Sequence, residues 1–138
     1  MSEELLYLSS QWCDAVRKRL TSTLSAEIMK NTSTSMVNVY ENCPDGKKHY
    51  FYTRMKEGLF TDILVGMGDE WPDAEFEITA DYEMFALVSQ GKLRSQKALM
   101  SGKMKLKGNM IKALKLVTIS DRMNKVISQV PARFEGGF

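Results

Sequence analysis

Hydrophobic residues near the start of the chain recur every three or four positions, which is the spacing of one face of an α-helix. The residues of this stripe are Leu5, Leu8, Trp12, Val16 and Leu20. Ser2 is of a type that often caps a helix N-terminus, so the pattern predicts a helix over residues 2–20. Residues 21–30 are expected to form a second, shorter helix, which the polar residues 31–35 end.

From residue 35 the pattern changes to short runs of β-branched and aromatic residues, which are typical of strands. Three such runs cover residues 35–42, 49–55 and 59–66. Short segments join them, and these contain the turn residues Pro-Asp-Gly at 44–46 and Gly58. Short connections favour antiparallel neighbours, so the three runs predict an antiparallel meander.

Two later segments alternate apolar and charged residues with the period of a strand. Residues 73–80 alternate acids with apolar residues, and residues 103–107 place Met104 and Leu106 between three lysines. These segments are predicted to be the fourth and fifth strands of the sheet.

Helical patterns occupy the rest of the second half. The predicted helices cover residues 82–90, 95–101, 110–117 and 120–130, and residues 132–138 are predicted to be a flexible tail. Because strands cluster apart from helices, the order is typical of an α+β fold, a sheet with helices on one face. A length of 138 residues predicts a single domain over residues 1–138.

The net charge of +2 hides a strong asymmetry along the chain. Residues 1–83 carry 8 bases and 15 acids, whereas residues 84–120 carry 8 bases and no acid. The basic segment has no aromatic residue between Phe85 and Phe134 on which bases could stack, so we expect no nucleic-acid partner. Two interpretations of its lysines remain open, a strip that contacts an anionic membrane and a ladder of charges within the sheet.

The ladder interpretation makes a specific prediction, and it is the one that the pattern favours. If the fourth and fifth strands are neighbours, three lysines should face three acids across them. The residues concerned are Lys103, Lys105 and Lys107 on one strand and Asp73, Glu75 and Glu77 on the other.

The location of the protein is predicted from what its sequence does not contain. No apolar stretch is long enough to span a bilayer, and residues 1–19 lack the pattern of a signal peptide. The last residues also differ from a Ser-Lys-Leu peroxisomal address. We therefore expect a soluble, cytoplasmic protein in which Cys13 and Cys43 are reduced, although a disulfide between them stays open.

Residues suited to catalysis or metal binding form no recognised pattern. His49 is the only histidine and is predicted to have no cysteine or acid at ligand spacing, so we expect no metal site. Neither cysteine has an identifiable activating base, and the chain has no nucleophile-elbow or phosphate-loop motif. We predict a protein that is not an enzyme, with no catalytic residue and no cofactor.

Flexible apolar residues are abundant instead. The chain has 10 methionines, a residue type that suits a surface repacking around varied apolar ligands, although methionines also fill ordinary cores. The predicted helix at 82–90 is apolar on all sides, and a small domain has few layers with which to cover it. One face of this helix is therefore expected to border an apolar cavity.

Residues 73–116 combine these features in a recognisable order. An alternating acidic strand is followed by an apolar helix, Gly91 and the run Ala-Leu-Met-Ser-Gly-Lys at 98–103. An alternating strand and Gly108-Asn109 then lead into another apolar helix. In this order the chain resembles the sterol-carrier-protein lipid-transfer domain family.

The resemblance implies a five-stranded, mostly antiparallel sheet with helices on one face enclosing an apolar tunnel. It also implies non-catalytic binding and transfer of a fatty acid, a fatty acyl-CoA or a sterol-like lipid. Transient contact with a membrane surface and a homodimer stay open. The alternative is a protein-interaction or accessory domain with a closed core. The lipid-binding residues implied by the resemblance are Phe85, Leu87, Val88, Leu99, Met100, Met104, Leu106, Met110, Ile111, Leu114, Met123, Val126 and Ile127.

Overall fold

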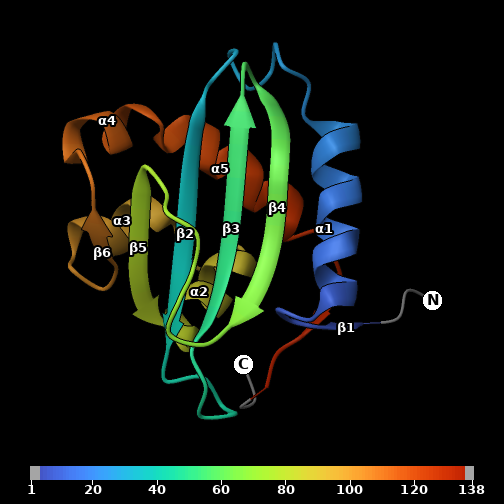
Figure 1. Ribbon diagram of the computed structural model, residues 1–138, viewed down its shortest axis with the longest axis vertical. Helices are drawn as coiled ribbons and strands as arrows, with labels where there is room; N and C mark the ends of the chain where they lie inside the picture. The colour runs from blue at the N-terminus through green and yellow to red at the C-terminus, as the bar shows by residue number, and fades with distance from the viewer. Residues whose placement is uncertain (1–3, 136–138) are drawn as a thin grey trace.

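A five-stranded sheet runs through the centre of the computed structural model, which describes residues 4–135 (Figure 1). The strands are β2 (Thr34–Glu41), β3 (His49–Lys56), β4 (Leu59–Met67), β5 (Phe76–Asp81) and β6 (Lys105–Lys107). Their order is β4-β3-β2-β5-β6. Only the β2–β5 pair is parallel among these five strands, so the predicted mostly antiparallel sheet and the meander β2-β3-β4 are confirmed.

The helices lie on one side of this sheet, as predicted. They are α1 (Ser10–Thr23), α2 (Tyr82–Ser89), α3 (Ser95–Met100), α4 (Met110–Lys115) and α5 (Val117–Ile127). Figure 1 shows α2 and α5 behind the sheet, α1 beside β4, and α3 and α4 beyond β5. The main core fills the space between the sheet and the helices. None of the helices in residues 4–135 is long and apolar enough to cross a membrane.

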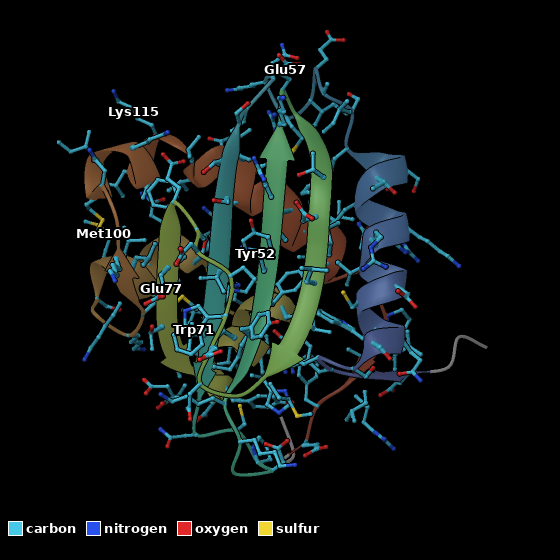
Figure 2. All side chains as sticks on the ribbon, viewed as in Figure 1. Tyr52, Glu57, Trp71, Glu77, Met100 and Lys115 are labelled. Atoms are coloured by element: carbon cyan, nitrogen blue, oxygen red, sulfur yellow. The ribbon has the colours of Figure 1, made fainter. Side chains whose placement is uncertain are left out.

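The opposite face of the sheet carries a much smaller apolar cluster. Val37, Val39 and Tyr52 are buried there, and Trp71 packs against them from the loop between β4 and β5. Figure 2 shows Tyr52 and Trp71 together on this face. The alternation along β2 explains the division, because successive side chains of a strand point to opposite faces.

The predicted N-terminal helix is wrong in its first half. Leu5–Leu6 form strand β1, which pairs in parallel with β7 (Ala132–Arg133), and α1 begins only after Ser9. The Ser9 hydroxyl oxygen accepts a hydrogen bond of 3.1 Å from the backbone N–H of Trp12. The helical spacing gave a wrong prediction here because Leu5 and Leu8 contact the same core as the apolar stripe of the helix. Leu5 does so from a strand, and Leu8 does so from a turn.

The second predicted helix is also wrong. Helix α1 continues to Thr23, and residues 26–31 form turns in which Lys30 and Asn31 have positive φ angles of 54° and 52°. Two consecutive left-handed residues cannot be accommodated in an α-helix. The predicted cap Ser2 lies outside the described residues.

The C-terminal segment differs from the predicted flexible tail. The backbone N–H of Tyr7 donates to the carbonyl oxygen of Arg133 at 3.0 Å, and the Phe134 ring packs on the Tyr7 ring with centroids 4.6 Å apart. Pairing with β1 therefore fixes residues 132–134, a long-range contact that local composition does not reveal. Residues 136–138 of the predicted tail lie outside the described residues.

The fourth and fifth strands, β5 and β6, are neighbours as the charge ladder requires, but only one of its three pairs is in register. The register places Lys107 opposite Glu77 and Lys105 opposite Thr79. Within residues 4–135, no ion pair joins Lys103, Lys105 or Lys107 to an acid. The other two predicted pairs are absent because β5 begins only at Phe76, so that Asp73 and Glu75 precede the strand.

The two nearest acids have other partners. The Trp71 indole N–H donates to Glu77 at 2.7 Å, and the Lys112 ammonium donates to Glu75 at 2.5 Å. Hydrogen bonds from Lys112 and Thr34 lower the pKa of the Glu75 carboxyl. The side chains of Lys103, Lys105 and Lys107 are exposed to solvent.

Candidate functional site

A partly open cavity of about 80 Å³ lies between the sheet and the helices. One wall consists of β2, β3, β5 and β6, and the other consists of residues from α2 to α5. Its apolar lining comprises Met36, Met55, Phe76, Ile78, Phe85, Val88, Leu99, Met104, Leu106, Ala113, Leu116, Val117, Ile119 and Met123. The cavity is therefore lined mainly by flexible and branched aliphatic side chains, with few charges to orient a polar substrate.

Six of the predicted site residues lie on this cavity: Phe85, Val88, Leu99, Met104, Leu106 and Met123. Three others, Leu87, Val126 and Ile127, do not line it; Leu87 is half-buried, and the other two are buried. The remaining four are exposed on the outside: Met100, Met110, Ile111 and Leu114. Contact of any of them with a ligand stays a prediction.

The segment around β6 brings Met104 and Leu106 to the cavity. Leu106 is paired with Ile78 of β5, and Met104 is only 3% exposed, with its backbone N–H donating to the carbonyl oxygen of Ala98 at 3.1 Å. The turn that follows needs Gly108, because its φ is 136° and a Cβ there would lie 2.8 Å from the carbonyl oxygen of Glu75. Asn109 then caps α4 by accepting from the Lys112 N–H at 3.1 Å.

The sequence-based prediction missed the cavity wall that the first strands supply. Met36 and Asn38 of β2 and Thr53 and Met55 of β3 line the cavity. The close match that carries the resemblance covers residues 73–116, and no lipid-binding residue was assigned to these strands. The alternation along β2 could have indicated this wall, since it places Met36, Asn38 and Tyr40 on the face opposite Val37.

One polar atom on the cavity wall is unsatisfied. Asn38 Oδ1 is buried and has no hydrogen-bond partner among the described residues. Leaving a buried acceptor unpaired costs about 1–3 kcal/mol. A hydrogen-bond donor on a bound molecule would recover part of this cost.

The aromatic side chains near Phe85 are neutral at physiological pH. The Phe85 ring lies 4.2 Å from the Tyr40 ring, and the Tyr40 and Tyr7 hydroxyl oxygens are 3.0 Å apart in a buried hydrogen bond. Burial raises the pKa of both phenols, so neither ionises near neutrality. This part of the cavity wall offers packing surface rather than an acid–base group.

The two cysteines are free thiols without the features of activated nucleophiles. Burial raises the pKa of Cys13, and burial followed by the Asp45 carboxylate raises the pKa of Cys43 to about 11. Reactive cysteines have the opposite shift, toward a stable thiolate. Cys13 instead directs its thiol toward the carbonyl oxygen of Ile63 at 3.6 Å.

Helix α4 and the end of α3 form the outer edge of the cavity wall. Helix α4 has no fully buried residue, and Met100 and Ile111 are 71% and 69% exposed. Figure 2 shows Met100 on the outer edge of the molecule, on the same side as Lys115. This edge therefore combines exposed apolar residues with bases from the segment that contains no acid.

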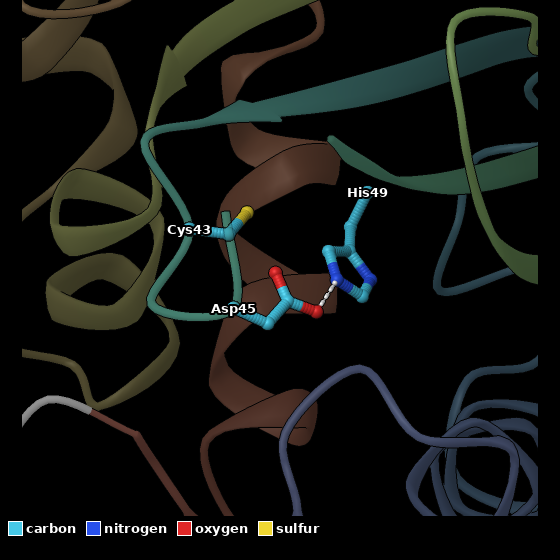
Figure 3. A group of neighbouring side chains, drawn as sticks. All are labelled: Cys43, Asp45 and His49. Carbon is cyan, nitrogen blue, oxygen red and sulfur yellow. Dashed lines mark hydrogen bonds and ion pairs between the residues drawn. The ribbon is translucent and has the colours of Figure 1, made fainter. Parts of the chain in front are cut away.

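The expectation that His49 has no cysteine or acid at ligand spacing is wrong. The His49 Nε2 and Asp45 Oδ2 atoms are 2.7 Å apart, and the ligand atoms of Cys43, Asp45 and His49 all lie within 4.8 Å of one another (Figure 3). The loop between β2 and β3 folds back on the first residue of β3, which the linear spacing did not indicate.

Comparison with known proteins agrees with this architecture. The sequence profile of the SCP-2 sterol transfer family matches residues 3–121. The fatty acid-binding protein of Yarrowia lipolytica is 33% identical over 90 residues, which are 64% of this chain and 66% of that protein. A crystal structure of sterol carrier protein 2 superposes with a TM-score of 0.77 at 22% identity, covering 90% of this chain and 98% of the other.

Longer relatives are similar as well. Human hydroxysteroid dehydrogenase-like protein 2 is 31% identical over 103 residues, which are 74% of this chain but only 23% of the human protein. The chain thus spans about a quarter of the length of such relatives. Because the family match covers most of the chain, from the first strand to the start of α5, the chain belongs to the SCP-2 sterol transfer family.

Proposed function

We propose that the protein binds a long apolar ligand in the cavity behind β2 and β5 and transfers it without chemical change. A fatty acid, a fatty acyl-CoA and a sterol-like lipid are the candidate ligands, and the cytoplasm is the expected location. The observation that carries the proposal is the partly open apolar cavity lined by Met36, Met55, Met104 and Met123. Burial of ligand methylenes, about 0.8 kcal/mol each, supplies the driving force.

The cavity must enlarge when such a ligand enters. Pockets that hold drug-sized ligands measure roughly 300–1,000 Å³, whereas this cavity measures about 80 Å³. Helix α4 is the element that can move at least cost, since it has no fully buried residue and contributes only Ala113 to the cavity wall. Methionine side chains can change rotamer to follow the new shape.

The direct test is to identify the lipid that the purified protein carries. Native mass spectrometry and solvent extraction should reveal one bound lipid, and a fluorescent fatty acid should be displaced from delipidated protein in a saturable way. A protein without bound lipid and without saturable displacement would contradict the proposal.

Asn38 is expected to favour ligands that carry a hydrogen-bond donor. In the Asn38→Leu variant, affinity for a long-chain alcohol should fall about two- to twelvefold, because one buried hydrogen bond contributes about 0.5–1.5 kcal/mol. The methyl ether of the same alcohol cannot donate, so its affinity should change little. Titration calorimetry with both ligands measures the difference. Equal losses for alcohol and ether would argue against a hydrogen bond to Asn38.

We also propose that the α3–α4 edge contacts anionic membranes during transfer. Met100 and Ile111 would enter the interface, and exposed bases would contribute about 1 kcal/mol each near an anionic surface. Eight bases and no acid lie in residues 84–120, which gives this edge the required charge.

Replacing Ile111 by aspartate should weaken binding to phosphatidylserine-containing vesicles at least fivefold, with no change in melting temperature. Its side chain is already exposed, so the fold does not depend on it. Leu59→Asp is the matched control, because Leu59 is 59% exposed on the β3–β4 hairpin. Vesicle co-sedimentation measures both. Equal loss in the two variants, or equal binding of the parent protein to neutral vesicles, would count against this edge.

The alternative function is that of a protein-interaction or accessory domain, in which the cavity is only part of a closed core and carries no lipid. The small volume of the cavity, about 80 Å³, favours it. In that case light scattering should show a homodimer or a stable complex with a partner, and the delipidated protein should bind no fatty acid.

A further inference from the structure

We propose that Cys43, Asp45 and His49 form a binding site for a divalent transition-metal ion, with Zn²⁺ as the best fit. Cys43 and Asp45 lie in the β2–β3 connection and His49 is the first residue of β3, at the end of the sheet where β2 ends (Figure 3). The site is distinct from the lipid cavity, because none of its residues lines that cavity. Metal binding is therefore independent of the proposed lipid transfer.

The loop holds its side chains in a defined arrangement. The Gly46 N–H donates to the carbonyl oxygen of Cys43 at 2.9 Å, and Gly46 has a φ of 76° that favours glycine. The Lys47 N–H donates to Asp45 Oδ1 at 3.0 Å. This bond orients the carboxylate, so that its other oxygen, Oδ2, meets His49.

The ligand types match a borderline-soft ion. Zn²⁺ takes thiolate sulfur at about 2.3 Å, imidazole nitrogen at about 2.0–2.1 Å and carboxylate oxygen at about 2.0–2.2 Å, in tetrahedral geometry. Ca²⁺ and Mg²⁺ prefer oxygen ligands, so one carboxylate among three ligands does not suit them. The mixed sulfur, nitrogen and oxygen set selects a transition metal.

The observed geometry is close to what a metal requires. Tetrahedral bond lengths place ligand nitrogen and oxygen about 3.3 Å apart, and sulfur about 3.6 Å from either. The Nε2–Oδ2 distance of 2.7 Å is that of a hydrogen bond, and the three ligand atoms lie within 4.8 Å of one another. The ion would replace the proton shared by Asp45 and His49, and a shift of about 1 Å in the loop would bring in the Cys43 sulfur.

The site opens onto a second cavity, which gives an ion access and a fourth ligand. This cavity measures about 380 Å³, and Cys43, Asp45 and His49 line it together with Glu135. Three protein ligands with a fourth position open to water are typical of accessible zinc sites rather than of closed structural ones. The carboxylates of Asp45 and Glu135 also make the potential at the cavity more favourable for a cation.

The test is a titration of tag-free, chelator-treated protein with Co²⁺ and then with Zn²⁺. We expect one equivalent of Co²⁺, a sulfur-to-cobalt charge-transfer band, and loss of this band when Zn²⁺ displaces the cobalt. Since His49 is the only histidine, Zn²⁺ should also shift the single imidazole signal in the NMR spectrum. Absence of the band, or an unchanged imidazole signal at saturating Zn²⁺, would overturn the proposal.

Variants distinguish the site from incidental thiol binding. Cys43→Ser should abolish the charge-transfer band, and Asp45→Asn, at an exposed position, should weaken Zn²⁺ binding at least tenfold. Cys13→Ser is the matched control, because Cys13 is a buried cysteine on α1 outside the cluster. The proposal is wrong if Cys13→Ser removes the band or if Asp45→Asn binds Zn²⁺ as tightly as the parent protein.

Discussion

The Ser120→Phe variant is expected to bind a fluorescent fatty acid at least tenfold more weakly than the parent protein. Ser120 is a half-buried residue of α5 that lines the cavity, and a phenyl ring at this position would occupy the space that the lipid chain needs. Excluding two methylenes from the cavity costs about 1.6 kcal/mol, and tenfold weaker binding corresponds to about 1.4 kcal/mol. Fluorescence titration of delipidated protein measures the change.

Thr118→Phe provides the control for this substitution. Thr118 lies on the same helix, two residues earlier, and its side chain is exposed and does not line the cavity. The control should bind the fatty acid as the parent protein does, and both variants should retain the parental circular dichroism spectrum. Unaltered affinity in a folded Ser120→Phe protein would remove this cavity as the lipid site.

Replacing Trp12 by alanine is expected to lower the free energy of unfolding by about 3–5 kcal/mol. Trp12 is 1% exposed, and its ring makes edge contacts with Tyr7 and Phe51 at centroid distances of 4.9 and 5.3 Å. Removing it would leave a void where α1, β3 and the segment after β1 meet. Urea unfolding followed by circular dichroism gives the free energy.

The second tryptophan of the chain supplies a comparison of equal side-chain size. Trp71 is half-buried on the open face of the sheet, where it covers Val37, Val39 and Tyr52. Trp71→Ala should cost about 1 kcal/mol, a value typical of substitutions outside the core. Similar losses for the two variants would show that the two faces of the sheet contribute comparably to stability.

Much of the fold could be predicted because local patterns agreed with the tertiary structure. The strands of the meander have short connections, and α2, α3 and α5 are apolar segments bounded by glycine or polar residues. Helix α5 was predicted over residues 120–130, and it buries Ile119, Met123, Val126 and Ile127. In these segments the residues that pack in the core are also those that specify the local conformation.

The errors occur where distant segments decide the conformation. Leu5 and Ala132 are paired partners from the two ends of the chain, and no local pattern distinguishes such a strand from the first turn of a helix. For the site, the resemblance implied Met104 and Leu106, and both line the cavity from β6 and the residue before it. Met110, Ile111 and Leu114 were expected on the inner face of their helix, but the cavity side of α4 is occupied by Ala113. Periodicity identifies an apolar side, but it does not show whether that side meets the protein interior or the solvent.

The pairing of β1 with β7 has a consequence for the order of folding during synthesis. The meander β2-β3-β4 joins segments that are close in sequence, so it can form early, whereas the β1–β7 contact closes a loop of nearly the whole described chain. Such distant contacts form slowly because of their loop-closure entropy. On the ribosome, the rings of Tyr7 and Phe134 can meet only after the last strand has emerged.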